Sequence, residues 1–417
     1  MCYMVFQMIE SKKAILKIIA FFLIGYSCNG NKQTLTNMPS AESPISCFDA
    51  EAPVTRTLNM DLINFLEDIR SVKLEMTSES IVGEVHDIVF GDGYILVITQ
   101  RDFFLFSDSG TFLNRPFNYG RGPDEVIAPG FSHEIRNSVI IFCDGSKFRG
   151  SIFFYNIQNR TMNKVVVPGG GHISHMIADS DTTLILVNNS VSRVDNFIVE
   201  YAYNLTRISR EGVVLDSFRL GSTQSFVQTS PSLIKDIHGD CFVSTPRGDT
   251  VLRFNGNNLE VVWRNVLSPY KPNLNEPMKI FAARTISLGK DAVLLIREGV
   301  EVSGEGIVMR RPGSAGKSPT RSITPEILLV DRLTGAVNEI KLFLENSMNP
   351  ITPGKLIILP EGRVCIAIKP SDLLAYNNAR KDFSESRIFG NKSKKEIRDS
   401  ISVNDNPYLI FGTIKSR

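Results

Sequence analysis

The sequence predicts an all-β fold, namely a six-bladed β-propeller of four-stranded antiparallel blades with a small helical insert in the last blade. Two observations lead to this prediction. From residue 81 onward, short alternating runs rich in Val, Ile, Phe and Tyr are bounded by Gly, Asp, Asn or Pro, which is the pattern of strands. No long helical segments alternate with these runs, so a parallel α/β sheet is not expected.

A recurring tight turn divides the strands into blades. It carries polar residues and a glycine that can supply the positive φ of a hairpin, and it recurs at Gly110, Gly212, Gly256 and Gly335. The repeat length is about 45–50 residues, which is typical of four-stranded propeller blades. Closing the sixth blade with strands from both chain ends would remove exposed sheet edges. The predicted blades are 81–119, 127–168, 172–221, 226–268, 278–345 and, for the sixth, 353–369, 407–415 and a strand near Val72–Met76.

Residues 1–27 have the features of an export signal. A basic stretch leads into an apolar run from Ile18 to Tyr26, which is too short to span a bilayer but suits a signal peptide. The run ends just before Cys28, and this resembles a bacterial lipoprotein signal, in which cleavage leaves a lipidated cysteine. An ordinary secretory signal and a single membrane anchor are the alternatives. We therefore expect lipid attachment at Cys28, the membrane as a partner through that lipid, and an outer-membrane lipoprotein of the cell envelope, facing the periplasm or the surface.

The rest of the chain divides at residue 56. Residues 28–55 are polar and show no hydrophobic period, which predicts a flexible tether. Residues 56–417 form the predicted propeller, which has two insertions. Residues 371–403 are polar with a helical pattern, and residues 299–325 are a loop containing Gly, Ser and Arg. A loop of this length without its own structure is uncommon, and it is either functional or flexible.

Charge and cysteine spacing argue against several classes of partner. Without residues 1–27, basic and acidic residues balance, whereas nucleic-acid binding domains carry a basic excess. His172 and His175 would point to opposite faces of a strand, and the cysteines form no Cys-x-x-Cys pair, so a metal site is not expected. We predict no metal, no cofactor and no nucleic-acid partner. The cysteines after Cys28 are Cys47, Cys143, Cys241 and Cys365.

Three segments of the chain carry distinctive motifs: the opening strand Ile81–Phe90, the junction Asn-Tyr-Gly-Arg-Gly-Pro-Asp-Glu-Val at 118–126, and the closing strand that begins Asn404-Asp-Asn-Pro. These motifs resemble those of the six-bladed β-propeller lipoproteins abundant in Bacteroides-type bacteria. The junction is similar to the family's Gly-Arg-Gly-Pro-Gly-Glu-Tyr motif, with Asp124 and Val126 as departures. The resemblance covers roughly residues 66–417 and implies a propeller in the cell envelope. It implies no particular activity, because such proteins are mostly of unassigned function.

Two charged segments are the candidate binding residues. Arg121, Asp124 and Glu125 lie at the predicted junction between the first two blades, where they would either contact a ligand at the channel mouth or lock the crossover through an ion pair. The predicted loop 299–325 would be either a solvated loop or a docking patch for an acidic glycan or a partner protein. Its basic residues are Arg310, Arg311, Lys317 and Arg321.

The leading functional hypothesis is a lipid-anchored binding or protein-interaction module of the cell envelope, whose ligand is a glycan or a peptide. The sequence contains no Gly-x-Ser-x-Gly elbow, and we assign no catalytic residue. One alternative is a glycan lyase or hydrolase with its site in the propeller channel, which would need a histidine such as His86, His133 or His238 beside a positioned carboxylate. Another is a purely structural envelope protein.

Overall fold

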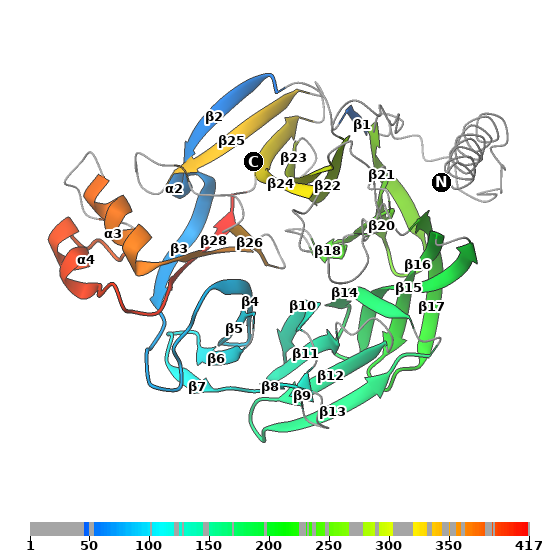
Figure 1. Ribbon diagram of the computed structural model, residues 1–417, viewed down its shortest axis with the longest axis horizontal. Helices are drawn as coiled ribbons and strands as arrows, with labels where there is room; N and C mark the ends of the chain where they lie inside the picture. The colour runs from blue at the N-terminus through cyan, green and yellow to red at the C-terminus, as the bar shows by residue number, and fades with distance from the viewer. Residues whose placement is uncertain are drawn as a thin grey trace, which may run out of the picture. The chain divides into compact units, whose positions relative to one another are not determined.

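The computed structural model forms a six-bladed β-propeller (Figure 1). Chain contacts separate Met1–Pro44 from Ile45–Arg417, and the residues described here all belong to the second unit. They are 46–49 and 54–415 apart from residues 101, 121–124, 127–128, 145–149, 169–170, 196–197, 225–230, 232, 236–238, 247–249, 267–277, 288–291, 303–319, 332–335, 344–349, 351–355, 360–362, 380–385 and 387.

Five blades use four consecutive antiparallel strands each, which confirms the predicted fold class. Blade 1 contains β4 (Val85–Gly91), β5 (Tyr94–Thr99), β6 (Phe103–Ser107) and β7 (Phe112–Asn114), and blade 2 contains β10 (Pro129–Arg136), β11 (Val139–Asp144), β12 (Ser151–Asn156) and β13 (Thr161–Val166). Blade 3 contains β14 (His172–Ala178), β15 (Thr183–Asp195), β16 (Ile198–Ser209) and β17 (Val214–Gln224). Blade 4 contains β18 (Leu233–Lys235), β19 (Cys241–Ser244), β20 (Thr250–Phe254) and β21 (Leu259–Val266), and blade 5 contains β22 (Met278–Ser287), β23 (Ala292–Val302), β24 (Thr320–Asp331) and β25 (Val337–Phe343).

The sixth blade is built from both ends of the chain, as predicted. Its strands are β26 (Leu356–Ile358), β27 (Arg363–Ile368), β28 (Tyr408–Ile414) and β3 (Leu66–Lys73). The N-terminal strand therefore begins and ends earlier than the predicted Val72–Met76. The first strands of blades 1 and 2, of blades 2 and 3 and of blades 3 and 4 contact one another on the inner side of the ring (Figure 1).

Two short strands upstream of β3 add a fifth, outer strand to blades 4 and 5. β1 (Ser46–Asp49) runs parallel to β21, and β2 (Arg56–Asp61) runs parallel to β25 before α2 (Leu62–Phe65) leads into β3. We call 46–61 the strap. The predicted tether through residue 55 is therefore wrong at residues 46–49, because these residues pair with an open sheet edge that would otherwise leave backbone groups unpaired.

The predicted hairpin glycines adopt the expected backbone conformation. The φ angles of Gly110, Gly212 and Gly256 are +91°, +86° and +91°, which only glycine adopts without strain. At Gly110 a Cβ atom would also overlap the carbonyl oxygen of Lys73 in the preceding blade. The third-to-fourth turn of this blade thus requires glycine for both its conformation and its packing. Gly335 lies outside the described residues.

The helical insert lies between β27 and β28 and packs against the propeller. It contains α3 (Pro370–Ala379) and α4 (Lys394–Ser400) (Figure 1, orange and red). A capping box between Ser393 and Glu396 begins α4, which satisfies the free N–H groups of its first turn. Leu373 and Ile397 are buried in an apolar cluster formed with blades 5 and 6. The insert predicted at 371–403 is therefore helical, and it adds to the core.

The loop predicted at 299–325 is shorter in the structure. β23 continues to Val302 and β24 begins at Thr320, with Glu301 opposite Arg321 in the register. Both ends of the segment are strand because β-branched residues alternate with polar ones there. Residues 303–319 lie outside the described part of the chain. No helix among the described residues is long and apolar enough to cross a membrane.

Candidate functional site

The two ends of the propeller differ in their polar contacts. At one end the first hairpins of neighbouring blades are bonded together: the Asp92 carboxylate accepts a hydrogen bond from Ser138 N–H at 3.0 Å, and Arg136 Nε lies 2.9 Å from Asp181 Oδ1. We call this the hairpin end, and it carries the β4–β5, β10–β11 and β14–β15 turns. Because successive strands are antiparallel, the second-to-third hairpins and the crossovers between blades lie at the opposite end, the crossover end.

A similar link ties the central strands together near the hairpin end. The Glu134 carboxylate of β10 accepts a hydrogen bond from Ala178 N–H of β14, and the Lys235 ammonium of β18 donates one to Ala178 C=O at 2.5 Å. One peptide segment of blade 3 is thus bonded to an acid from blade 2 and a cation from blade 4. These two charged groups serve the contact between blades, because both are engaged with backbone.

Two blades extend farther than the others at the crossover end. In blade 3, β15 and β16 have 13 and 12 residues, and in blade 5, β23 and β24 have 11 and 12. By contrast, β11 and β12 of blade 2 have 6 residues each. In blade 3, β14 pairs with β15 only as far as Asn189. Beyond that residue, β15 pairs with β16 alone, up to Asp195 opposite Ile198. The backbone N–H and C=O groups of these long hairpins are paired between the two strands, so the hairpins can extend without unpaired backbone groups.

The described ends of the junction motif are held firmly in place. β8 (Asn118–Tyr119) pairs parallel with β9 (Glu125–Val126), and Gly120 N–H donates to Val126 C=O at 3.1 Å. The Glu125 carboxylate lies against Gly120, where any side chain would overlap it. Val126 is fully buried in the apolar cluster between blades 1 and 2. The residues on both sides of 121–124 are therefore fixed to each other at the crossover end.

Phenylalanine rings pack against one another next to this junction. The ring of Phe117 lies 4.4 Å from that of Phe142 and 5.1 Å from that of Phe103. His133 belongs to the same cluster, with its ring stacked on Phe142 at 6.2 Å. Neither nitrogen of His133 has a hydrogen-bond partner among the described residues. Burial lowers the pKa of His133 to about 3, so the ring is neutral and does not act as an acid or a base near neutral pH.

The two predicted binding segments begin and end at the same end of the propeller. Most of their charged side chains lie outside the described residues, so no contact between them is described. The β8–β9 junction and the β23–β24 hairpin both belong to the crossover end. Glu125 is described at the junction, and Arg321 is placed by its backbone in β24. The remaining predicted binding residues and the predicted lipid-bearing cysteine lie outside the described part: Arg121, Asp124, Arg310, Arg311, Lys317 and Cys28.

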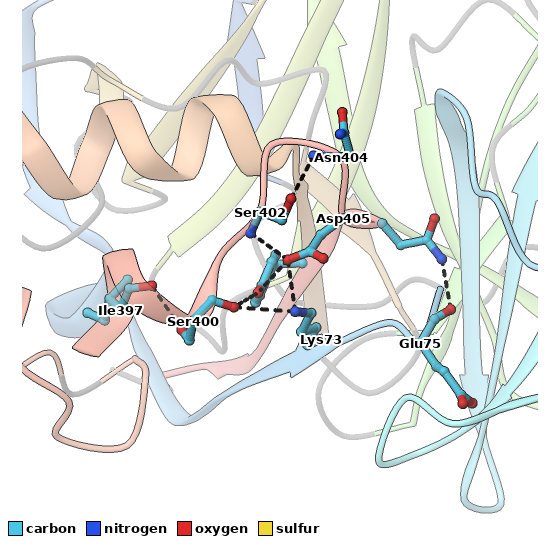
Figure 2. Close-up of polar contacts among 9 residues, drawn as sticks. Lys73, Glu75, Ile397, Ser400, Ser402, Asn404 and Asp405 are labelled. Carbon is cyan, nitrogen blue, oxygen red and sulfur yellow. Dashed lines mark hydrogen bonds and ion pairs between the residues drawn. The ribbon is translucent and has the colours of Figure 1, made fainter. Parts of the chain in front are cut away.

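A polar cluster that the sequence did not predict closes the ring in blade 6 (Figure 2). Lys73 Nζ lies 2.8 Å from Asp405 Oδ2 and donates to Ser400 C=O at 3.3 Å. Asp405 also accepts from Ser402 N–H at 2.8 Å, and the Tyr408 hydroxyl donates to the same Ser400 carbonyl at 3.3 Å. The only sequence signal was the position of Asp405 just before Asn406-Pro407. We call Lys73, Asp405 and Tyr408 the closing cluster.

The protonation states of the closing cluster are those of a structural ion pair. The hydrogen bond to Asp405 raises the pKa of Lys73, and burial raises the pKa of Tyr408. Burial alone would raise the pKa of Asp405, but Lys73 and the Ser402 N–H bind the carboxylate and hold its pKa below the usual value. Lysine and tyrosine therefore keep their protons while aspartate keeps its charge. A general base or a nucleophile would need the opposite shifts in the pKa of Lys73 or Tyr408.

Two of the buried cysteines of the propeller are not suited to nucleophilic chemistry. Cys143, Cys241 and Cys365 are buried and reduced. Burial raises the pKa of Cys241 to about 12 and raises that of Cys365 well above its ordinary value, so neither forms the reactive thiolate. Within the ranges that the structure describes, no three His, Cys, Asp or Glu side chains cluster to hold a metal.

Comparison with known proteins supports the architecture. A family described as a domain of unknown function, DUF4934, matches residues 45–413. No curated protein shows significant similarity to the sequence. Among solved structures, a candidate exported protein from Bacteroides fragilis aligns with a TM-score of 0.56 and 14% identity, over 89% of this chain and 99% of its own. Sequence identity at this level indicates a shared fold alone.

Two further solved structures align less well. A protein of unknown function from Bacteroides caccae has a TM-score of 0.35 and 14% identity, over 61% of this chain and 80% of its own. A polysaccharide lyase of family PL25, an ulvan lyase, has a TM-score of 0.33 and 12% identity, over 57% of this chain and 64% of its own. TM-scores this low carry no argument about this chain.

Proposed function

The chain belongs to the DUF4934 family, and we propose that it is a binding module of the cell envelope that recognises an acidic glycan or an acidic peptide at the crossover end of its propeller. The observation that carries this proposal is the pair of extended hairpins in blades 3 and 5. They project from the same end as the junction motif, and recognition in propellers uses the loops at the ends of blades.

The chemistry of the ligand follows from the residues carried by the blade 5 hairpin. Its segment contains Arg310, Arg311, Lys317 and Arg321 against Glu301 and Glu305. Arginine favours bidentate contacts with carboxylate, sulfate or phosphate groups. An acidic sugar or an acidic peptide is therefore the ligand class that this hairpin suits. Binding would weaken as salt rises, because screening acts within about 8 Å at physiological ionic strength.

Binding suits the described residues better than catalysis does. Glu134 and Lys235 bond to backbone between blades, the ring nitrogens of His133 are buried and its pKa is about 3, and Lys73 and Tyr408 of the closing cluster keep their protons. A lyase or hydrolase in the channel would instead need a positioned acid and base. Turnover of a glycan by the purified protein would overturn the binding proposal in favour of an enzyme.

The test replaces residues 303–319 with a two-residue turn, which keeps the last strand pair, Val302 and Thr320. Uronic-acid oligosaccharides, neutral oligosaccharides and an acidic peptide would be the probes, with binding measured by calorimetry at low and high salt. We expect the parent to bind an acidic probe and the shortened protein to fold normally but bind at least tenfold more weakly. A shortened protein that binds as tightly as the parent would show that this hairpin is not the site.

We also propose that the propeller is exported and held at the membrane by a lipid on Cys28. The basic stretch, the short apolar run and the cysteine that follows it support this location. The likeness to a candidate exported protein of Bacteroides fragilis is consistent with export. Replacing Cys28 with alanine should release the protein from the membrane fraction. Continued lipid labelling of that variant would contradict the assignment.

A further inference from the structure

Exposed apolar residues gather where the outer strands of blades 2 and 3 meet. Val166 is the last residue of β13. Val213 precedes β17, and Val214 and Leu215 are the first residues of that strand. Between 41% and 63% of each of these four residues is exposed. A Cβ atom on Gly212 would lie 3.4 Å from the carbonyl oxygen of Val166, so the two segments lie side by side here. We call Val166, Val213, Val214 and Leu215 the rim patch.

The start of β17 is also an open sheet edge. β17 is the outer strand of its sheet. Ser209 N–H donates to Val213 C=O at 2.9 Å, and Ser209 C=O accepts from Gly212 N–H at 3.0 Å. The next pair of the ladder, Ile208 and Val214, is therefore one whose members are not hydrogen-bonded to each other, and the N–H and C=O groups of Val214 point away from β16. An edge of this kind that carries apolar side chains is a place where another strand can pair.

Two other blades accept an added strand at the same edge. β1 runs parallel to β21 in blade 4, and β2 runs parallel to β25 in blade 5. In β2, Leu58 and Met60 pack on the apolar cluster of blades 5 and 6, whereas Arg56, Thr57 and Asn59 are exposed. The outer edge of a blade in this propeller therefore accepts an extended, parallel segment whose apolar side chains alternate with polar ones.

Blade 1 shows how the equivalent groups are bonded elsewhere in the ring. Gly110 and Gly212 take the same place in the turn before the outer strand, with φ angles of +91° and +86°. In blade 1, Glu75 N–H donates to Gly110 C=O and the Glu75 carboxylate accepts from Phe112 N–H, both at 2.8 Å. Val214 takes the place of Phe112 in blade 3, and no described residue bonds to its outward groups. In the described part of the chain, this edge is therefore open where those of blades 1, 4 and 5 are bonded.

We propose that an extended segment of a partner protein binds at this edge as a parallel fifth strand of blade 3, with its apolar side chains on the rim patch. Backbone hydrogen bonds to β17 would hold the segment, and its alternating apolar residues would give selectivity. A second copy of the chain suits the edge less well. Two β17 strands related by a two-fold axis would run antiparallel, whereas both strands that the fold already adds run parallel. The rim patch lies on the outer strands, so this proposal stands or fails independently of the proposed function at the crossover end.

The probe is a labelled peptide with the sequence of residues 54–61, which contains β2 and its alternating apolar residues. Fluorescence anisotropy measures its binding to the protein without the predicted signal, residues 29–417, and hydrogen exchange detected by mass spectrometry locates the bound peptide. We expect binding that protects the amides at the start of β17. Two analogues carry N-methyl groups at alternate positions, either 57 and 59 or 58 and 60. One analogue should bind at least tenfold more weakly than the other, because only one edge of the peptide would pair with β17.

Substitutions of exposed residues then assign the site. The double variant Val213→Lys/Leu215→Lys should bind the peptide at least tenfold more weakly, because binding would bury two charges that have no partner. The matched control is Val191→Lys/Val403→Lys, which adds two charges at exposed valines outside the rim patch, and it should bind like the parent. If the double variant does not fold, Val166→Lys decides the question from the neighbouring blade.

Four results would overturn the proposal. One is a protein that binds no peptide whether it begins at residue 29 or at residue 45. Another is peptide binding that leaves β17 unprotected or that the rim-patch variants do not weaken. A parent that dimerises in sedimentation experiments, while the double variant stays monomeric, would assign the edge to a second copy. Peptide binding to residues 45–417 but not to residues 29–417 would assign the edge to the chain's own upstream residues.

Discussion

At the residue scale, Asn406 shows how one side chain can join the two ends of the chain. Its amide nitrogen donates to the carbonyls of Glu75 at 2.8 Å and Ser80 at 2.6 Å, and its oxygen accepts from Val82 N–H at 2.8 Å. Only 2% of the residue is exposed. Ser80 and Val82 are buried, and leaving a buried backbone group such as Ser80 C=O or Val82 N–H without a partner costs about 1–3 kcal/mol. The Glu75 carbonyl also accepts from the Ser80 hydroxyl at 2.9 Å. This asparagine therefore specifies how the closing strand meets the start of blade 1.

His133 leads to a prediction about acid stability. Its pKa is about 3 in the folded protein and about 6.5 in an unfolded chain. Between these values the unfolded chain binds more protons, so the free energy of unfolding should fall as the pH falls, by up to about 1.4 kcal/mol per pH unit. Replacing His133 with phenylalanine should remove this contribution, because the ring lies among phenylalanines and a phenylalanine there carries no titrating group.

Urea unfolding at several pH values between about 3 and 7 measures this effect. The parent and His133→Phe curves should diverge as the pH is lowered, with the variant losing less stability. His86→Gln is the matched control, since His86 is an exposed histidine on the first strand of blade 1, and its profile should follow that of the parent. Parallel profiles for the parent and His133→Phe would show that another group controls acid unfolding.

At the element scale, the question is whether the outer strands of the strap are needed for the propeller to fold. β1 and β2 begin at Ser46 and Arg56, and β3 begins at Leu66, so the chain moves from one blade to the next with each strand. Blades 4 and 5 have four strands without the strap, whereas blade 6 has only three without β3. Outer strands satisfy edge groups but bury less surface than central ones.

A protein that begins at residue 54 should therefore fold cooperatively and lose only part of its stability. It lacks β1, so the outward amides of β21 should exchange faster with solvent, while those of β20 stay protected. Hydrogen exchange detected by mass spectrometry measures both strands in one experiment. A truncated protein that no longer folds, or that shows unchanged exchange in β21, would contradict the role assigned to the strap.

The same elements show what the sequence could and could not predict. The hairpin glycines and the alternating strands were predictable because turn conformation and strand pattern are local, and the structure confirms Gly110, Gly212 and Gly256. The strap was missed because β1, Ser-Cys-Phe-Asp, has no pattern of its own and forms by pairing with β21. The closing cluster was missed because Lys73 and Asp405 are distant in sequence. The charged loop segments were predicted as binding residues, and this remains a prediction.

At the scale of the whole molecule, apolar clusters between neighbouring blades hold the ring together. One cluster joins blades 1 and 2, another blades 2 and 3, another blades 3 and 4, another blades 5 and 6, and another blades 6 and 1. In the last of these, Leu409 and Cys365 of blade 6 pack with Ile88 and Ile95 of blade 1. Each blade therefore depends on its neighbours, so that opening one contact should weaken the rest.

Deleting residues 404–417 tests this dependence. The deletion removes β28, so β27 and β3 lose their common partner. It also removes Asn406 and Asp405, and with them the hydrogen bonds to Glu75, Ser80 and Val82 and the ion pair to Lys73. A central strand buries apolar side chains on both faces, and most residues of β28 are buried. We therefore expect cooperative unfolding to be lost.

The single tryptophan makes the measurement specific. Trp263 is the only tryptophan in the sequence and lies on β21 in blade 4, away from the deleted strand in blade 6. If the propeller unfolds as one unit, tryptophan fluorescence and far-ultraviolet circular dichroism should change together in the parent, and both transitions should broaden and move to lower urea in the deletion variant. Removing only residues 416–417 is the matched control and should leave both transitions in place. A deletion variant whose Trp263 signal keeps the parental midpoint would show that blade 4 is stable without a closed ring, and the dependence of each blade on its neighbours would then be wrong.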